Sequence, residues 1–255
     1  MNSFISWIGG KKLLRKHILE LFPEEYSRYI EVFGGAGWVL FGDERKGVLE
    51  VYNDINSDLV NLYRCIKYHP GEMQKELQGV FTSRELFFDA RSQMQMRGLT
   101  DIQRAARFYI LIRESYGADG RSFGMRPKAL HRAIDDFQEF SQRLNKVVIE
   151  NLDFEHLIST YDNESALFYA DPPYYNAEKY YPDRFNGEDH QRLYDCLDKI
   201  KGRFILSYND CPEIRNLYQK FNIEYVERQN NLVRDKGRRY GCLLYTSPSP
   251  RDVEE

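Results

Sequence analysis

The sequence has no run of about 18 consecutive apolar residues, the length that a transmembrane helix needs. Its start, MNSFISWIGGKK, also lacks the basic-then-apolar order of a signal peptide. Its cysteines, Cys65, Cys196, Cys211 and Cys242, show no CxxC spacing, which argues against a structural zinc site or a disulfide framework. We therefore expect a cytoplasmic protein with reduced thiols, no metal centre and no contact with a membrane.

The sequence has little net charge of either sign. Its 36 Lys and Arg residues nearly balance 39 Asp and Glu residues, for a net charge of -3 at pH 7, so evidence for a nucleic-acid partner must be local. Aromatic residues are abundant instead, at 15% with 19 tyrosines, and some are expected to form stacking surfaces. A length of 255 residues allows one large domain or a core with an inserted lobe.

Helix and strand patterns alternate at both ends of the chain. Apolar residues at helical spacing predict a helix over 11–22. YIEV predicts a short strand that breaks into the glycine loop GGAG, and GVLEVYNDIN predicts a second strand before a helix capped by Asn56 or Ser57. Further strands are predicted over 146–153, 167–170 and 202–210, with a helix from about Asp189 before the last of them. This alternation is typical of an α/β sheet.

Residues 61–145 have a different character, because helical patterns follow one another there without a good strand. The glycine-rich stretch YGADGRSFG within them predicts a loop or hairpin. We therefore predict a discontinuous core of residues 1–60 and 146–245, with a mainly helical lobe inserted between its two parts. Residues 246–255 are rich in serine and proline and are predicted to be a disordered or non-native tail.

The stretch LFYADPPYY contains the most specific motif. Four residues typical of a buried strand, 167–170, lead directly into Asp171. Because a proline favours an extended conformation in the residue before it, Asp171 is predicted to be held at the strand end. Pro172 offers a carbonyl oxygen without a competing N–H, and Tyr174 offers a flat ring. The alternative is a proline-rich turn with surface tyrosines.

Two fixed acceptors beside a ring suit an adenine base. Asp171 and the Pro172 carbonyl can each accept one hydrogen bond from the exocyclic N6 amine while Tyr174 stacks on the base. The two acceptors draw the nitrogen lone pair out of conjugation, so N6 becomes a better nucleophile for in-line methyl transfer. A paired adenine cannot reach such a pocket, so the base has to leave the stack of the double helix.

The glycine loop EVFGGAG and the acid Asp54 indicate a nucleoside site. Glycines after a strand allow a ligand to approach closely, and an acid at the end of the next strand can accept hydrogen bonds from a ribose diol. Gly35 and Gly37 lack the third glycine of a dinucleotide fingerprint, since Leu40 follows. The pattern favours a nucleoside without phosphates, such as S-adenosylmethionine, but a purely structural glycine turn fits it equally.

The N-terminal stretch WIGGKK has two interpretations. Lys11 follows two glycines and can meet a carboxylate, such as the methionine end of the cofactor. The same residues also fit a glycine bend before a helix with solvated lysines. Taken alone, the motif favours the glycine bend with solvated lysines.

Together these motifs resemble those of the Dam-like family of DNA N6-adenine methyltransferases, over roughly residues 4–240. WIGGK is similar to the family's N-terminal cofactor motif, EVFGGAG to its glycine motif, YNDIN to its ribose-binding segment and DPPY to its catalytic motif. NLDFEHLI lies where the family contacts the cofactor adenine, and FILSYND resembles a later core strand that lines the target-base pocket. The resemblance implies a Rossmann-like methyltransferase sheet with an inserted target-recognition lobe, S-adenosylmethionine as cofactor and double-stranded DNA as substrate.

The resemblance also implies roles for individual residues. Those that would contact the cofactor are Trp7, Lys11, Phe33, Gly35, Gly37, Asp54, Asp153 and Phe154. Those that would hold the target adenine are Asp171, Pro172 and Tyr174. We expect a monomer in a bacterial or phage-infected cell, with a cognate restriction endonuclease as a candidate partner.

Two parts of the chain depart from this family. The final apolar strand expected after RRYGxLL gives way to YTSPSPRDVEE, which leaves the last strand of the sheet in doubt. The segment SYGADGRSFGMRPK fits phage-type members better than the GATC-specific enzymes. The resemblance therefore implies no particular target sequence.

Local charge in the lobe favours DNA as the partner. Between Arg91 and Arg132 there are nine Lys or Arg residues against three acids, with aromatic residues interleaved. The residues predicted to contact DNA are Arg113, Tyr116, Arg121, Arg126 and Lys128. A solvated basic helix face is the alternative interpretation.

Three functions are compatible with the sequence, and a site-specific DNA adenine methyltransferase is favoured. A PPY motif can also activate other planar amines, so methylation of RNA or of a protein glutamine amide is the second. A catalytically silent DNA-binding module is the third. The acids Asp54 and Asp171 are both present, which argues against a silent module.

Overall fold

The computed structural model describes residues 1–124, 134–176, 185–229 and 239–247. Strands in these ranges form a seven-stranded sheet in the order β3-β2-β1-β4-β5-β7-β6. They are β1 (Arg28–Glu31), β2 (Leu49–Asn53), β3 (Val147–Glu150), β4 (Ala166–Ala170), β5 (Arg203–Asn209), β6 (Asn222–Gln229) and β7 (Arg239–Thr246). The first five are parallel, and β7 is antiparallel to both of its neighbours. The predicted Rossmann-like α/β sheet is confirmed.

The order of the strands reverses between β1 and β4, which are neighbours in the sheet. β2 and β3 follow on one side of β1, whereas β5 follows on the far side of β4. In open parallel sheets, ligands bind beyond the carboxyl ends of the strands at such a reversal. Asp54 directly follows β2 and Asp171 directly follows β4, so both acids lie at this edge of the sheet.

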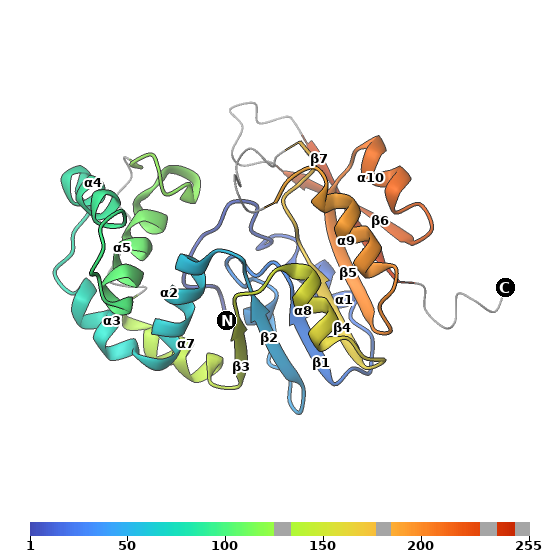
Figure 1. The fold of residues 1–255 in the computed structure, drawn as a ribbon, viewed down its shortest axis with the longest axis horizontal. Coiled ribbons are helices and arrows are strands. Elements are labelled where there is room, and N and C mark those ends of the chain that lie inside the picture. Colours follow the sequence, from blue (N-terminus) through green and yellow to red (C-terminus); the bar gives the residue numbers. More distant parts are fainter. Residues whose placement is uncertain (125–133, 177–184, 230–238, 248–255) are drawn as a thin grey trace.

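Side chains of the strands pack into two hydrophobic layers, because successive residues of a strand point to opposite faces. Tyr29 and Tyr169 belong to the layer shared with the lobe, whereas Ile30 and Phe168 belong to the other. Helices α8 (Phe154–Tyr161), α9 (Asp189–Leu197) and α10 (Pro212–Leu217) pack on this second layer, and α1 (Arg15–Glu20) packs on the first (Figure 1).

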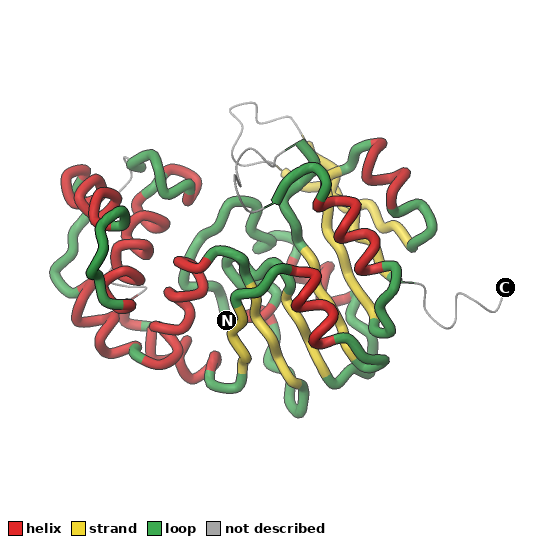
Figure 2. Tube along the Cα trace, viewed as in Figure 1, coloured by secondary structure: helices red, strands yellow, loops and turns green. Residues whose placement is uncertain are grey.

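The lobe is helical, as the sequence predicted. Its described helices are α2 (Ser57–Tyr68), α3 (Pro70–Leu77), α4 (Arg84–Gln93), α5 (Asp101–Glu114) and α7 (Phe137–Leu144). They stand beside the β3 edge of the sheet (Figure 1 and Figure 2). Asn56 caps α2 by accepting hydrogen bonds from the N–H groups of Asp58 and Leu59, which confirms one of the two predicted caps.

A buried group of ions joins the lobe to the sheet. Arg143 of α7 donates from Nη1 and Nη2 to the two carboxylate oxygens of Glu50 in β2, at 2.6 and 2.7 Å. Arg45 donates to the same carboxylate at 3.1 Å. The three side chains are only 2% (Arg45), 4% (Glu50) and 7% (Arg143) exposed. The group therefore fastens α7 to the strand that leads to Asp54.

Helix α1 is shorter than the predicted helix over 11–22. Lys11 lies in a turn before it, where its carbonyl accepts the N–H of Leu14 at 3.0 Å. After Glu20 the helix ends, and Pro23 disfavours helical geometry in the residue before it. The shorter helix leaves the Lys11 backbone outside the regular structure, next to the strand ends.

The last two strands extend the sequence prediction. β6 was not predicted from the sequence, although Ile223 and Tyr225 alternate with polar residues. In the structure these two side chains are 40% and 51% exposed. β7 does form, and it includes Thr246, which pairs with Ile205 of β5. The sheet therefore takes in the first residue of the predicted tail, and residues 248–255 lie outside the described ranges.

Candidate active site

A cavity of about 250 Å³ lies at the reversal of strand order, beyond the carboxyl ends of β1, β2 and β4. It brings together segments that are far apart in the sequence: the N-terminal bend, the glycine loop, the residues after β2 and β3, and the turn after β4. The predicted site residues that line it are Trp7, Lys11, Phe33, Gly35, Asp54, Asp153, Phe154, Asp171, Pro172 and Tyr174. Gly37 does not line it.

Two tyrosine hydroxyls fix the backbone of the glycine loop. Tyr52 of β2 and Tyr63 of α2 both donate hydrogen bonds to the Gly35 carbonyl, at 2.7 and 3.2 Å. Gly35 has a φ of 49°, and a Cβ there would lie 2.7 Å from the Trp7 ring. Gly37 also has a positive φ, but its N–H closes the turn on the Gly34 carbonyl, so its role is in the loop itself.

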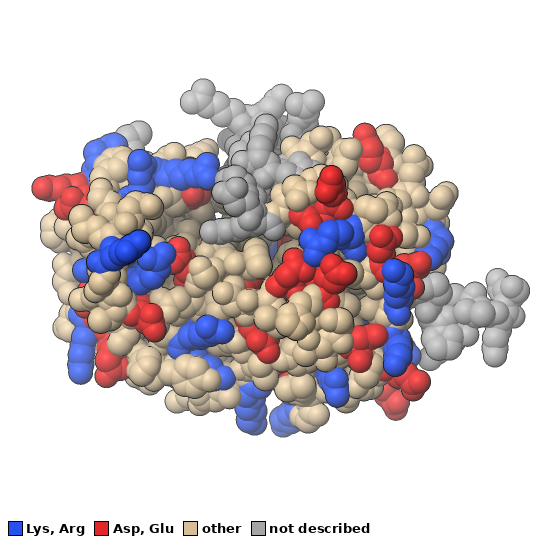
Figure 3. All heavy atoms as spheres, viewed as in Figure 1, with Lys and Arg blue, Asp and Glu red and all other residues tan. Residues whose placement is uncertain are grey.

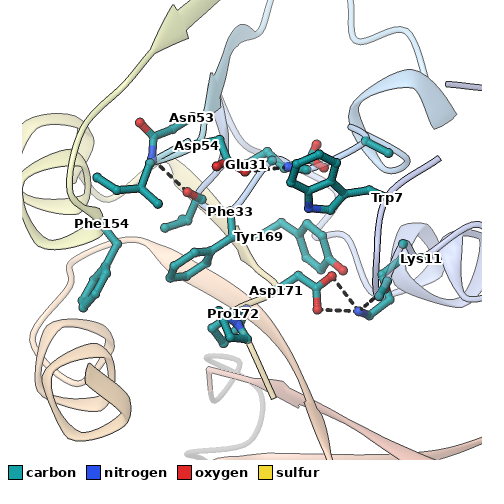
Figure 4. Close-up of a pocket in the computed structure, with 18 of the residues that line it drawn as sticks. Trp7, Lys11, Glu31, Phe33, Asn53, Asp54, Phe154, Tyr169, Asp171 and Pro172 are labelled. Carbon is teal, nitrogen blue, oxygen red and sulfur yellow. Dashed lines mark hydrogen bonds and ion pairs between the residues drawn. The ribbon is translucent and has the colours of Figure 1, made fainter. Parts of the chain in front are cut away.

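Asp54 faces the glycine loop and accepts hydrogen bonds from the backbone. Its Oδ2 accepts the Gly35 N–H at 2.9 Å, and its Oδ1 accepts the Asn56 N–H at 2.8 Å. Each carboxylate oxygen can accept more than one hydrogen bond, so a diol can share these oxygens with the backbone donors. The backbone bonds orient the carboxylate toward the cavity that it lines (Figure 4).

Asp171 forms the polar centre of the site. The Lys11 ammonium lies 2.5 Å from Oδ1 and 2.6 Å from Oδ2 of Asp171 (Figure 4). The Lys11 side chain is only 3% exposed. Ser207 of β5 donates its hydroxyl to Oδ1 at 2.7 Å. Lys11 therefore meets a carboxylate of the protein itself, so it is not a solvated lysine, although the glycine bend before it is present.

Glu31, at the end of β1, is a buried acid to which the sequence analysis gave no role. Its Oε2 accepts hydrogen bonds from the Tyr29 hydroxyl at 3.0 Å and the Leu40 N–H at 2.8 Å. Burial raises the pKa of Glu31 to about 8, against the opposing effect of these donors. Burial therefore favours the neutral form of this carboxyl more than it would for an exposed glutamate.

Three aromatic rings form one wall of the cavity. Phe33 lies 5.7 Å from Phe154 and 5.8 Å from Phe185, measured between ring centroids. Phe185 was not predicted, because no motif surrounds it in the sequence. Asp153 lies at the rim, where its carboxylate caps α8 through the Glu155 N–H and pairs with Arg192 at 2.8 Å.

Tyr174 and Pro172 complete the wall on the side of β5. Pro172 is buried directly after Asp171. The Tyr174 ring lies 4.8 Å from the Lys11 ammonium, and its hydroxyl is 3.4 Å from the Cys242 sulfur on β7. The turn after β4 thus presents an acid and a ring toward the same cavity.

None of the predicted DNA-contact residues that the structure describes, Arg113, Tyr116 and Arg121, lines this cavity. Residues 115–124 form a loop closed by a bridge between Ser115 and Phe123, where Tyr116 is 65% exposed and Arg121 is exposed. Arg113 is half-buried at the end of α5. Basic side chains gather at this end of the lobe, near α4 (Figure 3). Arg126 and Lys128 lie outside the described residues.

The described part of the chain contains no cluster of three or more metal-binding side chains. None of the helices in the described ranges has the length and apolar character that a membrane crossing requires. An α/β sheet with a cavity beyond the carboxyl ends of its strands, at a reversal of strand order, is typical of α/β proteins that bind ligands there.

Comparison with known proteins identifies the family. Residues 7–232 match the model of the D12 class of N6 adenine-specific DNA methyltransferases. The chain therefore belongs to this family, and it is an adenine-specific DNA methyltransferase. S-adenosylmethionine is the methyl donor that membership of a methyltransferase family implies.

Curated relatives align with this chain over most of their own length. The type II methyltransferase M1.LlaDCHI of Lactococcus lactis subsp. cremoris is 30% identical over 89% of this chain and 88% of its own. The type II methyltransferase M.MjaIII of Methanocaldococcus jannaschii is 29% identical over 92% and 95%. The DNA adenine methylase of Haemophilus influenzae is 23% identical over 92% and 89%.

Proposed function

We propose that the cavity binds S-adenosylmethionine and that Asp171, Pro172 and Tyr174 hold the target adenine beside it. The observation that carries this proposal is that Asp171, the glycine loop and Asp54 all line the same cavity. The lining fits such a cofactor, because Asp54 offers acceptors for a ribose diol and the rings of Phe33 and Phe154 offer faces for a base.

Bound S-adenosylmethionine would supply an electrophilic methyl group on a sulfonium. Asp171 and the Pro172 carbonyl would each accept a hydrogen bond from the N6 amine, and Tyr174 would stack on the base. The cofactor would supply the methyl group for the new N6–C bond, with its sulfur as the leaving group, while Asp171 would accept the proton that N6 loses. The chain contributes positioning and preorganised charge, which typically supply most of such a rate acceleration.

The cavity is buried beyond the strand ends, so the adenine would have to leave the DNA stack to enter it. Exposed Tyr116 and Arg121 in loop 115–124 would contact the duplex around the extruded base. Arg113, Arg126 and Lys128 are proposed as further contacts on the grounds of charge alone. Phosphate contacts from a basic lobe would let a protein with a net charge of -3 bind DNA.

Asp54→Ala is expected to weaken S-adenosylmethionine binding by roughly tenfold or more, because a diol loses a charged acceptor. Asp162→Ala is the matched control, since Asp162 also accepts two backbone N–H groups, those of Lys201 and Gly202, both at 3.0 Å to its nearer oxygen. It lies at the opposite end of the strands. Calorimetry that gave equal cofactor affinity for both variants would exclude Asp54 as the ribose ligand.

Arg121→Ala is expected to weaken DNA binding, by roughly fivefold or more if it contacts a phosphate, and to lower the slope of log K against log salt by about one unit. Arg203→Ala is the control, because Arg203 is an exposed arginine at the amino end of β5. Binding is measured against salt on target and scrambled duplexes. Equal curves for Arg121→Ala and wild type would place DNA contact elsewhere in the lobe.

The biological role of the methylation is a further proposal. Relatives such as M1.LlaDCHI and M.MjaIII are named type II methyltransferases, which supports a cognate restriction endonuclease as a partner of this chain. We propose a monomer, and single-molecule modification sequencing of DNA from cells that express the chain would identify the methylated sequence.

A further inference from the structure

The turn that carries the proposed catalytic residues, residues 171–175, is attached to β5 at both of its ends. Ser207 contacts Asp171 at the start of the turn, and Asn209 contacts Tyr175 at its end. Residues two apart in a strand point to the same face. Ser207 and Asn209 therefore form one edge against which the whole turn, named here the catalytic turn, is placed.

Ser207 is the middle residue of a hydrogen-bonded series that runs from the Tyr169 hydroxyl to the Asp171 carboxylate. It is 0% exposed, and its hydroxyl donates to Asp171 Oδ1 at 2.7 Å. Because that proton is directed to the carboxylate, the Tyr169 hydroxyl, 3.3 Å away, has to donate to the Ser207 oxygen. Burial raises the pKa of Tyr169 well above its ordinary value, so it remains a donor. Both hydroxyls therefore donate in the same direction, and the series ends on Asp171 Oδ1.

This contact makes the two oxygens of Asp171 unequal. Oδ1 receives the Ser207 hydroxyl and lies 2.5 Å from the Lys11 ammonium, whereas Oδ2 contacts Lys11 alone among the described residues. A carboxylate with one oxygen fixed by a rigid strand cannot rotate freely about χ2. The less occupied Oδ2 is then held in one position.

Asn209 fixes the far end of the turn with its side-chain amide. Its Oδ1 accepts the Tyr175 N–H at 3.0 Å, and its Nδ2 donates to the Tyr175 carbonyl at 3.4 Å. A side chain thus replaces the ladder bonds that a neighbouring strand would make with this residue. The ring of Tyr174, the residue before it, lies 6.3 Å from that of Tyr208. Fixing Tyr175 therefore also limits movement of the proposed stacking ring.

We propose that Ser207 and Asn209 are positioning residues of the catalytic turn, and that Ser207 orients Asp171 so that Oδ2 accepts the N6 amine of adenine. This inference rests on the proposed catalytic role of Asp171. Neither residue touches substrate in it; both act by holding groups that do. Preorganised acceptors matter for a rate because a misplacement of about 1 Å at the reacting centre can cost roughly 100-fold.

Ser207→Ala tests the first half of the proposal. We expect kcat for methyl transfer to fall roughly tenfold to 100-fold, as for loss of a hydrogen bond to a charged group, while cofactor affinity stays within about twofold. Ser207→Thr keeps the hydroxyl and should recover most of the loss. Ser141→Ala, which removes a 2.7 Å bond to the Lys67 carbonyl on α2, is the control and should keep wild-type kcat.

A double-mutant cycle separates failure of this inference from failure of the proposed function. In an Asp171→Ala background, Ser207→Ala should cost no further activity, because its partner is already gone. If Asp171→Ala itself stays active, the proposed catalytic assignment fails. If Asp171→Ala is impaired but Ser207→Ala matches wild type, or if the two losses multiply, the positioning role of Ser207 is wrong.

Asn209→Ala tests the second half. Asn163→Ala is its matched control, because the Asn163 Oδ1 also accepts a backbone N–H, that of Ser165, at the same 3.0 Å. We expect Asn209→Ala to lower single-turnover methylation by roughly tenfold and Asn163→Ala to leave it unchanged. Equal rates for the two variants, with both proteins folded by circular dichroism, would overturn the role of Asn209.

Discussion

Asp171→Ala is expected to slow methyl transfer by roughly 100-fold or more, because the variant loses a preorganised acceptor for the N6 amine. Binding of S-adenosylmethionine should stay within a few-fold of wild type, since Asp54 and the glycine loop are unchanged. The rate is measured under single-turnover conditions on duplex DNA, and cofactor binding is measured by calorimetry. Activity within a few-fold of wild type would remove Asp171 from the reaction.

The structure adds a complication to this experiment. The Lys11 side chain is 3% exposed, so Asp171→Ala leaves a buried ammonium without its counter-charge, although its hydrogen bond to the Gly9 carbonyl remains. Removing one member of a buried ion pair is typically strongly destabilising. The double variant Lys11→Met/Asp171→Ala removes both charges. It should recover part of the lost melting temperature without recovering activity, which would separate a folding defect from a loss of chemistry.

The sequence predicted those parts of the site that are contiguous in the chain. Asp171, Pro172 and Tyr174 lie within one motif, and Asp54 lies directly after a strand. Each follows the carboxyl end of a parallel strand, so a correct strand assignment was enough to bring them to one edge. The helical lobe was predicted for a related reason, since amphipathic periodicity is also a local signal.

The contacts between distant segments were not predictable in this way. Lys11 and Asp171 are 160 residues apart, and the local sequence of Lys11 by itself favoured a solvated lysine. Ser207 lies among buried residues of β5, and its local sequence gives no reason for a hydroxyl there. The reason appears only in the contact with Asp171. Glu31 carried a weak signal: an acid at the end of an otherwise buried strand. Such a residue needs specific donors, and these come from Tyr29 and the backbone of Leu40.

The attachment of the lobe to the core gives the second large expected effect. Glu50→Gln keeps the shape of the side chain but removes the charge that faces Arg45 and Arg143. Two buried guanidinium groups would then lack a counter-charge. Loss of one partner from a buried pair costs about 3–5 kcal/mol, which corresponds to a fall in melting temperature of roughly 6–20 °C for a chain of this size.

Asp210→Asn is the matched control for Glu50→Gln. Asp210 also binds a guanidinium through both oxygens, that of Arg215, at 2.6 and 3.0 Å. That pair is exposed on both sides, at 31% and 45%, so water replaces the lost partner and the melting temperature should change far less. The two variants thus share the chemistry of the lost contact and differ in its burial.

A third variant tests whether unpaired buried guanidinium groups cause the fall in melting temperature. In Glu50→Leu/Arg143→Met the bidentate pair is replaced by apolar side chains, and part of the melting temperature lost in Glu50→Gln should return, because fewer buried charges are unpaired. Arg143 also donates to the carbonyls of Leu40 and Asp43, so recovery should be incomplete. If Glu50→Gln melts like wild type, the ion group does not stabilise the contact between α7 and β2. The position of the lobe relative to the cavity would then depend on the shared hydrophobic core and on hydrogen bonds such as that from Lys67 to the Val147 carbonyl.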